Sequence, residues 1–128
     1  MIIGTGIDII EVDRIRRSLE RHGERFIKRV FTPEEQALAP TGPDPGPFYA
    51  GRWAAKEAVA KTFGTGIGAG CSWTDICVLR DAAGKPYIEM RGNGALTAAG
   101  LKISMIHVSI SHIKDYACAS AVAESAHA

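Results

Sequence analysis

Two carboxylates and a lysine in this sequence have the types and spacing of a divalent-cation site that faces phosphate. Asp8 lies within the apolar segment GIDII, where a carboxylate is costly to bury unless it is paired or binds a metal. Glu57 and Lys61 lie four residues apart in a segment that we expect to be helical, so both occupy one face. Two hard carboxylate ligands suit Mg²⁺, which usually completes its shell with water and substrate phosphates. We therefore predict that Asp8 and Glu57 bind Mg²⁺ against a polyphosphate, with Lys61 nearby.

A glycine-rich loop, GTGIGAG at residues 64–70, follows this helix at once. Such loops allow backbone N–H groups to approach phosphate oxygens closely. A flexible connector with a glycine helix cap is the ordinary alternative, and the loop fits neither the GxGxxG nor the Walker pattern. Taken singly, Asp8 also has an ordinary role as a turn cap, and Glu57 with Lys61 as a surface ion pair. The metal hypothesis depends on all these features occurring together.

His112 ends the strand-like segment VSISH and is a weaker candidate. No cysteine lies at zinc-ligand spacing beside it. A Ser–His nucleophile pair also has little support, because adjacent strand residues point to opposite faces and no GxSxG motif is present. From local pattern alone, a structural histidine is the commoner case.

A basic segment lies near the N-terminus. From Arg14 to Arg29 the sequence has seven basic and two acidic residues, a net charge of +5 in a chain whose total is +1. A solvated face is the common role of such a segment, and a docking surface for an acidic partner is the functional alternative. DNA is a third alternative, although no helix-turn-helix or zinc motif accompanies the charge.

The expected order of strands and helices, which must position these residues, indicates an α+β domain spanning residues 1–128, with an antiparallel sheet packed on a long helix. Residues 2–10 read as a strand, residues 13–29 as two helical pieces broken near Gly23, and TPEE at 32–35 as a capping box. A proline-rich loop at 40–47 precedes the long helix, at 48–63. Two hairpins and a short helix complete the chain, with strands at 75–79, 87–90, 102–111 and 116–122 and the helix at 93–99.

Length and composition indicate one ordinary globular domain. The chain has 128 residues, of which 46% are hydrophobic and 23% charged. Three cysteines with no CxxC pair are expected to be reduced thiols, which favours a cytoplasmic location. The apolar N-terminus lacks a basic region and contains Asp8, so it does not resemble a signal peptide, and no apolar run is long enough to span a bilayer.

These motifs resemble those of the holo-[acyl-carrier-protein] synthases, the small bacterial-type 4′-phosphopantetheinyl transferases. The resemblance covers nearly the whole chain, and its motifs are GTGIDIIEVDRI, FTPEE, AGRWAAKEAVAKTFGTGIG, GKP and VSISH…YACASAV, in that order. It implies the phosphopantetheinyl transferase fold and a homotrimer with active sites between subunits. It further implies Mg²⁺-dependent transfer of 4′-phosphopantetheine from coenzyme A to a serine of apo acyl carrier protein, which activates the carrier for fatty acid or polyketide synthesis. Nucleic acid and membrane are not expected partners.

The resemblance also implies roles for individual residues. Asp8 and Glu57 match the metal ligands, and Lys61 matches the lysine near the pyrophosphate. A second set matches positions that bind coenzyme A: Arg52, Gly84, Lys85, Pro86 and His112. A third set falls on the helix that binds the acidic carrier protein: Arg14, Arg21 and Arg25.

Two alternative functions also fit the sequence. A catalytically silent module that binds coenzyme A or a nucleotide would share the fold, although the intact Asp8, Glu57 and Lys61 argue against it. A small DNA-binding protein would use the basic segment and would bind duplex with a steep salt dependence.

Overall fold

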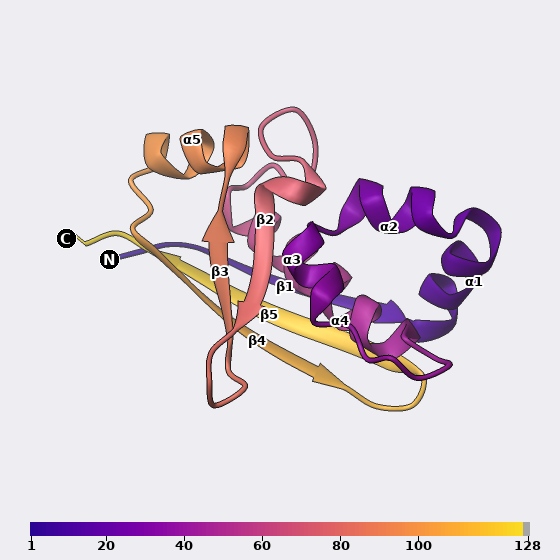
Figure 1. Cartoon of the computed structure of the whole chain (residues 1–128). Coiled ribbons are helices and arrows are strands. Elements are labelled where there is room, and N and C mark those ends of the chain that lie inside the picture. The colour runs from indigo at the N-terminus through magenta and orange to yellow at the C-terminus, as the bar shows by residue number, and fades with distance from the viewer. Residues whose placement is uncertain (127–128) are drawn as a thin grey trace.

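The computed structural model describes residues 1–126, shown in Figure 1. In these residues the elements follow in the order β1 (Ile2–Glu11), α1 (Val12–His22), α2 (Glu24–Val30), α3 (Pro33–Ala37), α4 (Gly46–Thr62), a 3₁₀ turn (Trp73–Asp75), β2 (Ile76–Arg80), β3 (Pro86–Met90), α5 (Gly92–Gly100), β4 (Met105–His112) and β5 (Tyr116–Glu124). This mixture of helices and antiparallel strands confirms the predicted α+β class.

The strands form two antiparallel sheets, whereas the sequence predicted one. The larger sheet has the order β1-β5-β4, and β2 and β3 form a separate hairpin. In the larger sheet Asp8 pairs with Ala119, which in turn pairs with Ile110. Strand β1 is therefore one edge of this sheet and β4 is the other, a separation that matters for the functional residues.

Helix α4 packs across one face of the larger sheet and forms the centre of the core (Figure 1). Its buried face is rich in alanine, and β5 contributes four further buried alanines that face it. Two glycines of β1 make the approach close, since a methyl group at Gly6 would collide with the carbonyl of Ala58 and one at Gly4 with that of Thr62. The alternating glycines of the N-terminal segment thus mark the strand on which the long helix lies.

Helices α1 to α3 follow the predicted signals. Gly23 separates α1 from α2 with a φ of 49°, a conformation that favours glycine. The predicted capping box is present at α3, where the Thr32 hydroxyl accepts from Glu35 N at 3.2 Å and the Glu35 carboxylate accepts from Thr32 N at 2.7 Å. The sequence therefore identified both the break and the cap correctly.

Two predicted starts differ from the structure by two residues or more. Helix α4 begins at Gly46 rather than residue 48, because a proline is tolerated in a first turn and the Asp44 side chain accepts a hydrogen bond from Gly46 N at 3.1 Å. Strand β4 begins at Met105 rather than residue 102. There the chain first closes the end of α5, with Lys102 at a φ of 63° and its N–H donating to Ala99 O at 2.9 Å.

All three cysteines, Cys71, Cys77 and Cys118, are free thiols, which agrees with the expectation of no disulfide. Over residues 1–126, none of the helices has both the length and the apolar character needed to cross a bilayer.

Candidate functional site

Asp8, Glu57 and Lys61 come together between β1 and α4. Asp8 faces the helix with a side chain that is 17% exposed, and the Lys61 ammonium lies 3.3 Å from its carboxylate. The same Lys61 Nζ donates to the backbone carbonyl of Ile7 at 2.8 Å. Lys61 therefore binds both the strand and its carboxylate, while about half of its side chain stays open to solvent.

Glu57 carries a charge that the protein does not fully compensate. Within the described residues its carboxylate makes no hydrogen bond or ion pair. Partial burial, and then the neighbouring charge of Asp8, raise the pKa of Glu57, although Lys61 and Arg14 oppose this. A divalent cation between the two carboxylates would relieve both the burial cost and the repulsion.

The donor set fits a hard cation that keeps most of its water. No group of three or more acidic, histidine or cysteine side chains able to hold a metal occurs in residues 1–126. Two carboxylates without further protein ligands are typical of Mg²⁺ completed by water and phosphate, and unsuited to structural zinc. The charges of the two predicted carboxylates thus suit that ion.

An aromatic group extends this site toward α1. The Trp53 ring lies 4.1 Å from that of Trp73 and 6.0 Å from that of Phe26. The Arg14 guanidinium lies 6.0 Å from the centre of the Trp53 ring, and its charge lowers the pKa of Glu57. Sequence analysis predicted Arg14 on a docking helix but did not predict that it lies near the predicted metal site. The only signal was indirect: Trp53, the ring that Arg14 approaches, shares one helix face with Glu57.

Arg52 and His112 line a different cavity, of about 440 Å³. Arg52 is largely buried there, its guanidinium lies 4.3 Å from the centre of the Phe48 ring, and its Nε has no hydrogen-bond partner. Burial, and then the nearby charge of Arg80, lower the pKa of Arg52. Two guanidinium groups that repel each other in a cavity form a site for an anion.

Arg80 is a residue of this cavity that sequence reasoning missed. It is the last residue of β2, and no spacing rule relates it to Arg52 in α4. Only the fold brings these two cations together.

The predicted turn at Gly84, Lys85 and Pro86 lies in the β2–β3 hairpin, where Pro86 pairs with Arg80 of the anion cavity. Gly84 has a φ of 88°, and the Asp81 carboxylate accepts from Ala83 N and Lys85 N at 2.9 Å each. Lys85 and Pro86 line a cavity of about 280 Å³ against β4, which Arg52 and His112 do not line.

The geometry of α4 separates the metal-type residues from the anion cavity. Arg52 and Glu57 are five positions apart, so they point about 140° away from each other around the helix axis. Asp8 lies on one edge strand and His112 at the end of the other, two strand spacings or about 10 Å apart across the sheet. One chain therefore contains two groups of functional type on different sides of α4.

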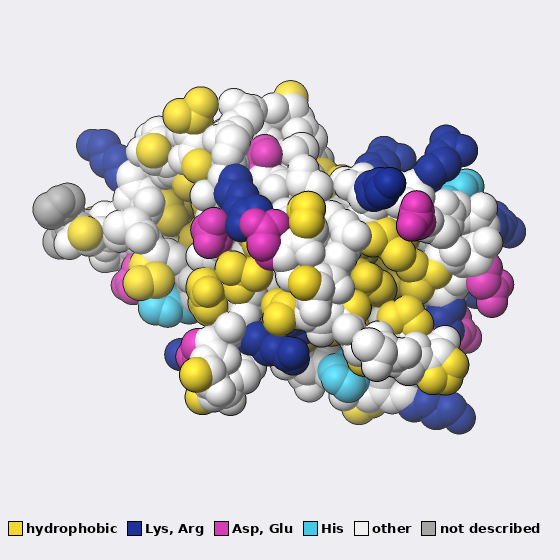
Figure 2. Space-filling model, viewed as in Figure 1, with side chains coloured by type: hydrophobic (Ala, Val, Ile, Leu, Met, Phe, Trp, Pro, Cys, Tyr) yellow, Lys and Arg dark blue, Asp and Glu magenta, His cyan; other side chains and the backbone are white. Residues whose placement is uncertain are grey.

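The basic surface over α1 and α2 is partly neutralised. Figure 2 shows Lys and Arg side chains gathered over these helices. Arg16 bonds Asp13 and Asp44, and Lys28 lies 3.7 Å from Glu24. Arg14, Arg21 and Arg25 are exposed and form no ion pair with any described residue. These three are the predicted carrier-binding arginines, and their charge is available to a partner.

Known proteins that are similar to this chain in sequence belong to one family. A model of the 4′-phosphopantetheinyl transferase superfamily matches residues 4–121. A holo-[acyl-carrier-protein] synthase of Alkaliphilus metalliredigens is 49% identical over 124 residues, covering 96% of this chain and 99% of that protein. A synthase of the same name from Koribacter versatilis is 43% identical over 97% of this chain and 99% of its own length.

Solved structures agree. The crystal structure of the Neisseria meningitidis synthase has a TM-score of 0.89 at 38% identity, covering 98% of this chain and all of that chain. A Bacillus anthracis synthase in complex with CoA (3′,5′-ADP) has a TM-score of 0.82 at 41% identity, covering 98% of this chain and 99% of that chain.

Proposed function

The chain belongs to the 4′-phosphopantetheinyl transferase superfamily, and from that premise we propose that it is an enzyme that transfers 4′-phosphopantetheine from coenzyme A to a serine of an apo acyl carrier protein. The products are holo acyl carrier protein and adenosine 3′,5′-bisphosphate. The observation that carries this proposal is the Asp8–Glu57 pair beside Lys61, since the reaction splits a pyrophosphate that needs charge neutralisation.

Asp8 and Glu57 are the residues that would hold Mg²⁺, and the bound ion would supply charge neutralisation to the pyrophosphate. Lys61 is fixed by Asp8 and by the carbonyl of Ile7, so its ammonium is already oriented before substrate arrives. That charge offsets the negative charge that develops on the departing phosphate. Arg14, near Glu57, adds a further positive charge on the side from which a carrier protein would approach.

The cavity of Arg52, Arg80 and His112 is suited to the non-reacting phosphate of coenzyme A. It offers positive charge and has no candidate metal ligand. The buried Arg52 Nε is a hydrogen-bond donor that has no acceptor among the described residues. Lys85 and the backbone of the Gly84–Pro86 turn would contact another part of the same substrate. These assignments follow the resemblance, with Arg80 added from the fold.

A second copy of the chain would complete the site. Glu57 and Arg52 point about 140° apart around the axis of α4, so we infer that one chain does not present both the metal-type residues and the anion cavity to one coenzyme A. The sheet face opposite α4 is also uncovered and apolar, with Ile7 70% and Ile9 67% exposed and with Met105 and Tyr116 about half exposed. Following the resemblance for the number of subunits, we propose a homotrimer in which these faces pack together and each active site lies between two subunits.

The acidic carrier protein would dock on α1 and α2 through Arg14, Arg21 and Arg25. The free thiols and the use of coenzyme A favour a cytoplasmic location. Nucleic acid and membrane are not part of the proposed function.

A mass-spectrometric assay tests the proposal. Apo acyl carrier protein is incubated with coenzyme A, Mg²⁺ and the protein, and transfer adds the mass of one phosphopantetheine group to the carrier serine. A carrier that binds the protein but gains no mass, with coenzyme A also bound, would instead identify a silent binding module. Duplex DNA in a gel-shift experiment provides the control for the basic surface, and no shift is expected.

A further inference from the structure

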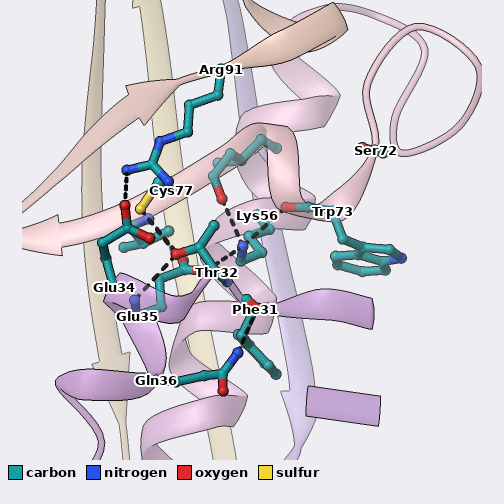
Figure 3. A network of polar contacts seen from close by, with 12 residues as sticks. Phe31, Thr32, Glu34, Glu35, Gln36, Lys56, Ser72, Trp73, Cys77 and Arg91 are labelled. Atoms are coloured by element: carbon teal, nitrogen blue, oxygen red, sulfur yellow. Dashed lines mark hydrogen bonds and ion pairs between the residues drawn. The ribbon is translucent and has the colours of Figure 1, made fainter. Parts of the chain in front are cut away.

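A buried ion pair joins α4 to α3 at Lys56, about 100° around the helix axis from Glu57. The side chains of Lys56 and Glu35 are both fully buried, and Lys56 Nζ lies 2.7 Å from Glu35 Oε1 (Figure 3). The same Nζ donates to the backbone carbonyls of Trp73 at 3.0 Å and Ile76 at 2.6 Å. All three protons of the ammonium group therefore have acceptors.

Glu35 is equally well bonded. Its Oε1 accepts from Thr32 N at 2.7 Å and its Oε2 from Val78 N at 2.8 Å. The pair thus ties three parts of the fold to one point on α4: helix α3, the 3₁₀ turn and strand β2. Both partners bury a full charge, which gives little net stability compared with well-packed apolar side chains, so stability alone does not explain the pair.

The buried side chains that α4 packs on the larger sheet are mostly small, whereas its aromatic side chains Tyr49 and Trp53 pack on Phe31 and Trp73. Ala50, Ala54, Ala55, Ala58 and Ala60 are completely buried. Short side chains make a smooth surface with shallow ridges and grooves, which restricts rotation of a helix about its axis less than interlocking long side chains do. Lys56 is the largest fully buried side chain that α4 contributes in the described residues.

Rotation of α4 matters because the candidate metal ligand is the next residue. Glu57 lies about 100° around the axis from Lys56, and its carboxylate lies about 6 Å from that axis, so a roll of about 20° would move it by roughly 2 Å. Displacements of about 1 Å are enough to disrupt a catalytic constellation.

We infer that the Glu35–Lys56 pair is a positioning device that fixes the roll of α4 and so holds Glu57 against Asp8 for metal binding. Lys56 touches neither metal nor substrate; its three bonds to Glu35, Trp73 and Ile76 set the angle at which the helix presents its other face. This inference rests on the proposed metal site and adds what orients it.

The test measures metal affinity rather than activity, with Mn²⁺ as a spectroscopic substitute for Mg²⁺. Mn²⁺ is titrated by electron paramagnetic resonance in the presence of coenzyme A, and the folded fraction is checked by circular dichroism. In Lys56→Met/Glu35→Gln both charges are removed and side-chain volume is kept, so no unpaired charge is buried. We expect this variant to be folded and to bind Mn²⁺ at least about tenfold more weakly than the wild type.

Arg91→Met is the matched control. Arg91 also bonds a glutamate of α3, Glu34 at 2.8 Å, but it comes from the end of β3 and does not contact α4 through that bond. This variant also removes a cation that pairs with a glutamate of α3, and its Mn²⁺ affinity should equal that of the wild type.

A second variant covers the case in which the double variant does not fold. Glu35→Gln keeps the two carbonyl acceptors of Lys56 and should weaken Mn²⁺ binding by a smaller factor, about threefold. A folded Glu35→Gln or double variant with wild-type Mn²⁺ affinity would overturn the inference and leave the pair a structural one. A wild-type protein that binds no Mn²⁺ in the presence of coenzyme A would overturn the metal site itself and this inference with it.

Discussion

The two sides of α4 differ in how their charges are balanced. On the side of β1, two carboxylates and a lysine lie together, and Lys61 is already bonded to Asp8. On the other side, Arg52 and Arg80 share a cavity, and Arg52 Nε has no acceptor. The first side is short of positive charge around Glu57, and the second has an excess of it.

The difference indicates that each side is half of a site. An unpaired carboxylate favours the binding of a cation, and an unpaired guanidinium favours the binding of a phosphate. Coenzyme A with Mg²⁺ would supply both. Because the two halves lie on different sides of α4, we expect the substrate to lie between the first half of one chain and the second half of another.

Loss of the metal carboxylates should have the largest effect. Asp8→Ala or Glu57→Gln should lower transfer by about a thousandfold or more, since the metal stabilises the transition state by several kcal/mol. Steady-state transfer at saturating Mg²⁺ measures this. A variant with near-wild-type turnover would show that the residue is not a ligand.

Glu57→Gln should also stabilise the metal-free fold. Burial and Asp8 raise the pKa of Glu57 in the folded state, so the folded state binds that proton more tightly than the unfolded state. Ionised Glu57 therefore costs stability above its pKa, and the cost vanishes as the pH falls below the unfolded value. In chelator at neutral pH, the variant should melt above the wild type, with the gap closing in acid. If the variant and the wild type melted at the same temperature at neutral pH, ionised Glu57 would not destabilise the fold.

Lys61→Ala should reduce kcat by about a hundredfold and raise the KM for coenzyme A much less, because its charge matters most as the pyrophosphate splits. Separate determination of kcat and KM decides this. An increase in KM with unchanged kcat would make Lys61 a ground-state binding residue only.

On the other side of α4, Arg80→Met should raise the KM for coenzyme A by about tenfold, the effect of one charge-assisted hydrogen bond. The pyrophosphate belongs to the metal side, so the cavity should take the 3′-phosphate, and the KM for dephospho-coenzyme A should change little. Lys102→Met, an exposed lysine outside both halves, is the control. An equal loss with both substrates would place the 3′-phosphate elsewhere.

The docking arginines should have the smallest effect. Arg14→Glu/Arg21→Glu should weaken carrier-protein affinity by more than the ~0.2–1 kcal/mol of one surface ion pair, and should make its KM less dependent on salt. Coenzyme A affinity should be nearly unchanged, and Lys102→Glu is the charge-matched control for the single variant Arg14→Glu. Equal salt dependence in wild type and double variant would mean that the carrier docks elsewhere.

Local patterns predicted most of the fold. The TPEE segment identified the α3 cap, and Gly23 the break between α1 and α2, because both depend on neighbouring residues only. The second role of Glu35, as acceptor for Lys56 and Val78, could not be predicted, since it depends on how α3 packs on α4 and β2. The division of the strands into two sheets is likewise a matter of long-range pairing.

The candidate site shows the same limit. Asp8, Glu57 and Lys61 were predicted to meet, and they do, because an apolar strand and a helical repeat each fix one face. Arg80 had no local signal, and neither did the fact that Lys85 and Pro86 line one cavity while Arg52 and His112 line another. Which residues share a cavity depends on the fold, and which cavities share a substrate depends on the assembly.

A mixing experiment tests the central claim that each active site combines the two halves from different subunits. Asp8→Ala and Arg52→Ala proteins, each nearly inactive alone, are unfolded and refolded together in equal amounts, and transfer is measured. If the sites lie between subunits, some pair an intact metal half with an intact anion cavity, and random assembly should restore roughly a quarter of the wild-type rate. Activity that stays at the level of the separate variants, in mixtures shown to contain hybrid oligomers, would contradict the account and place the whole site within one chain.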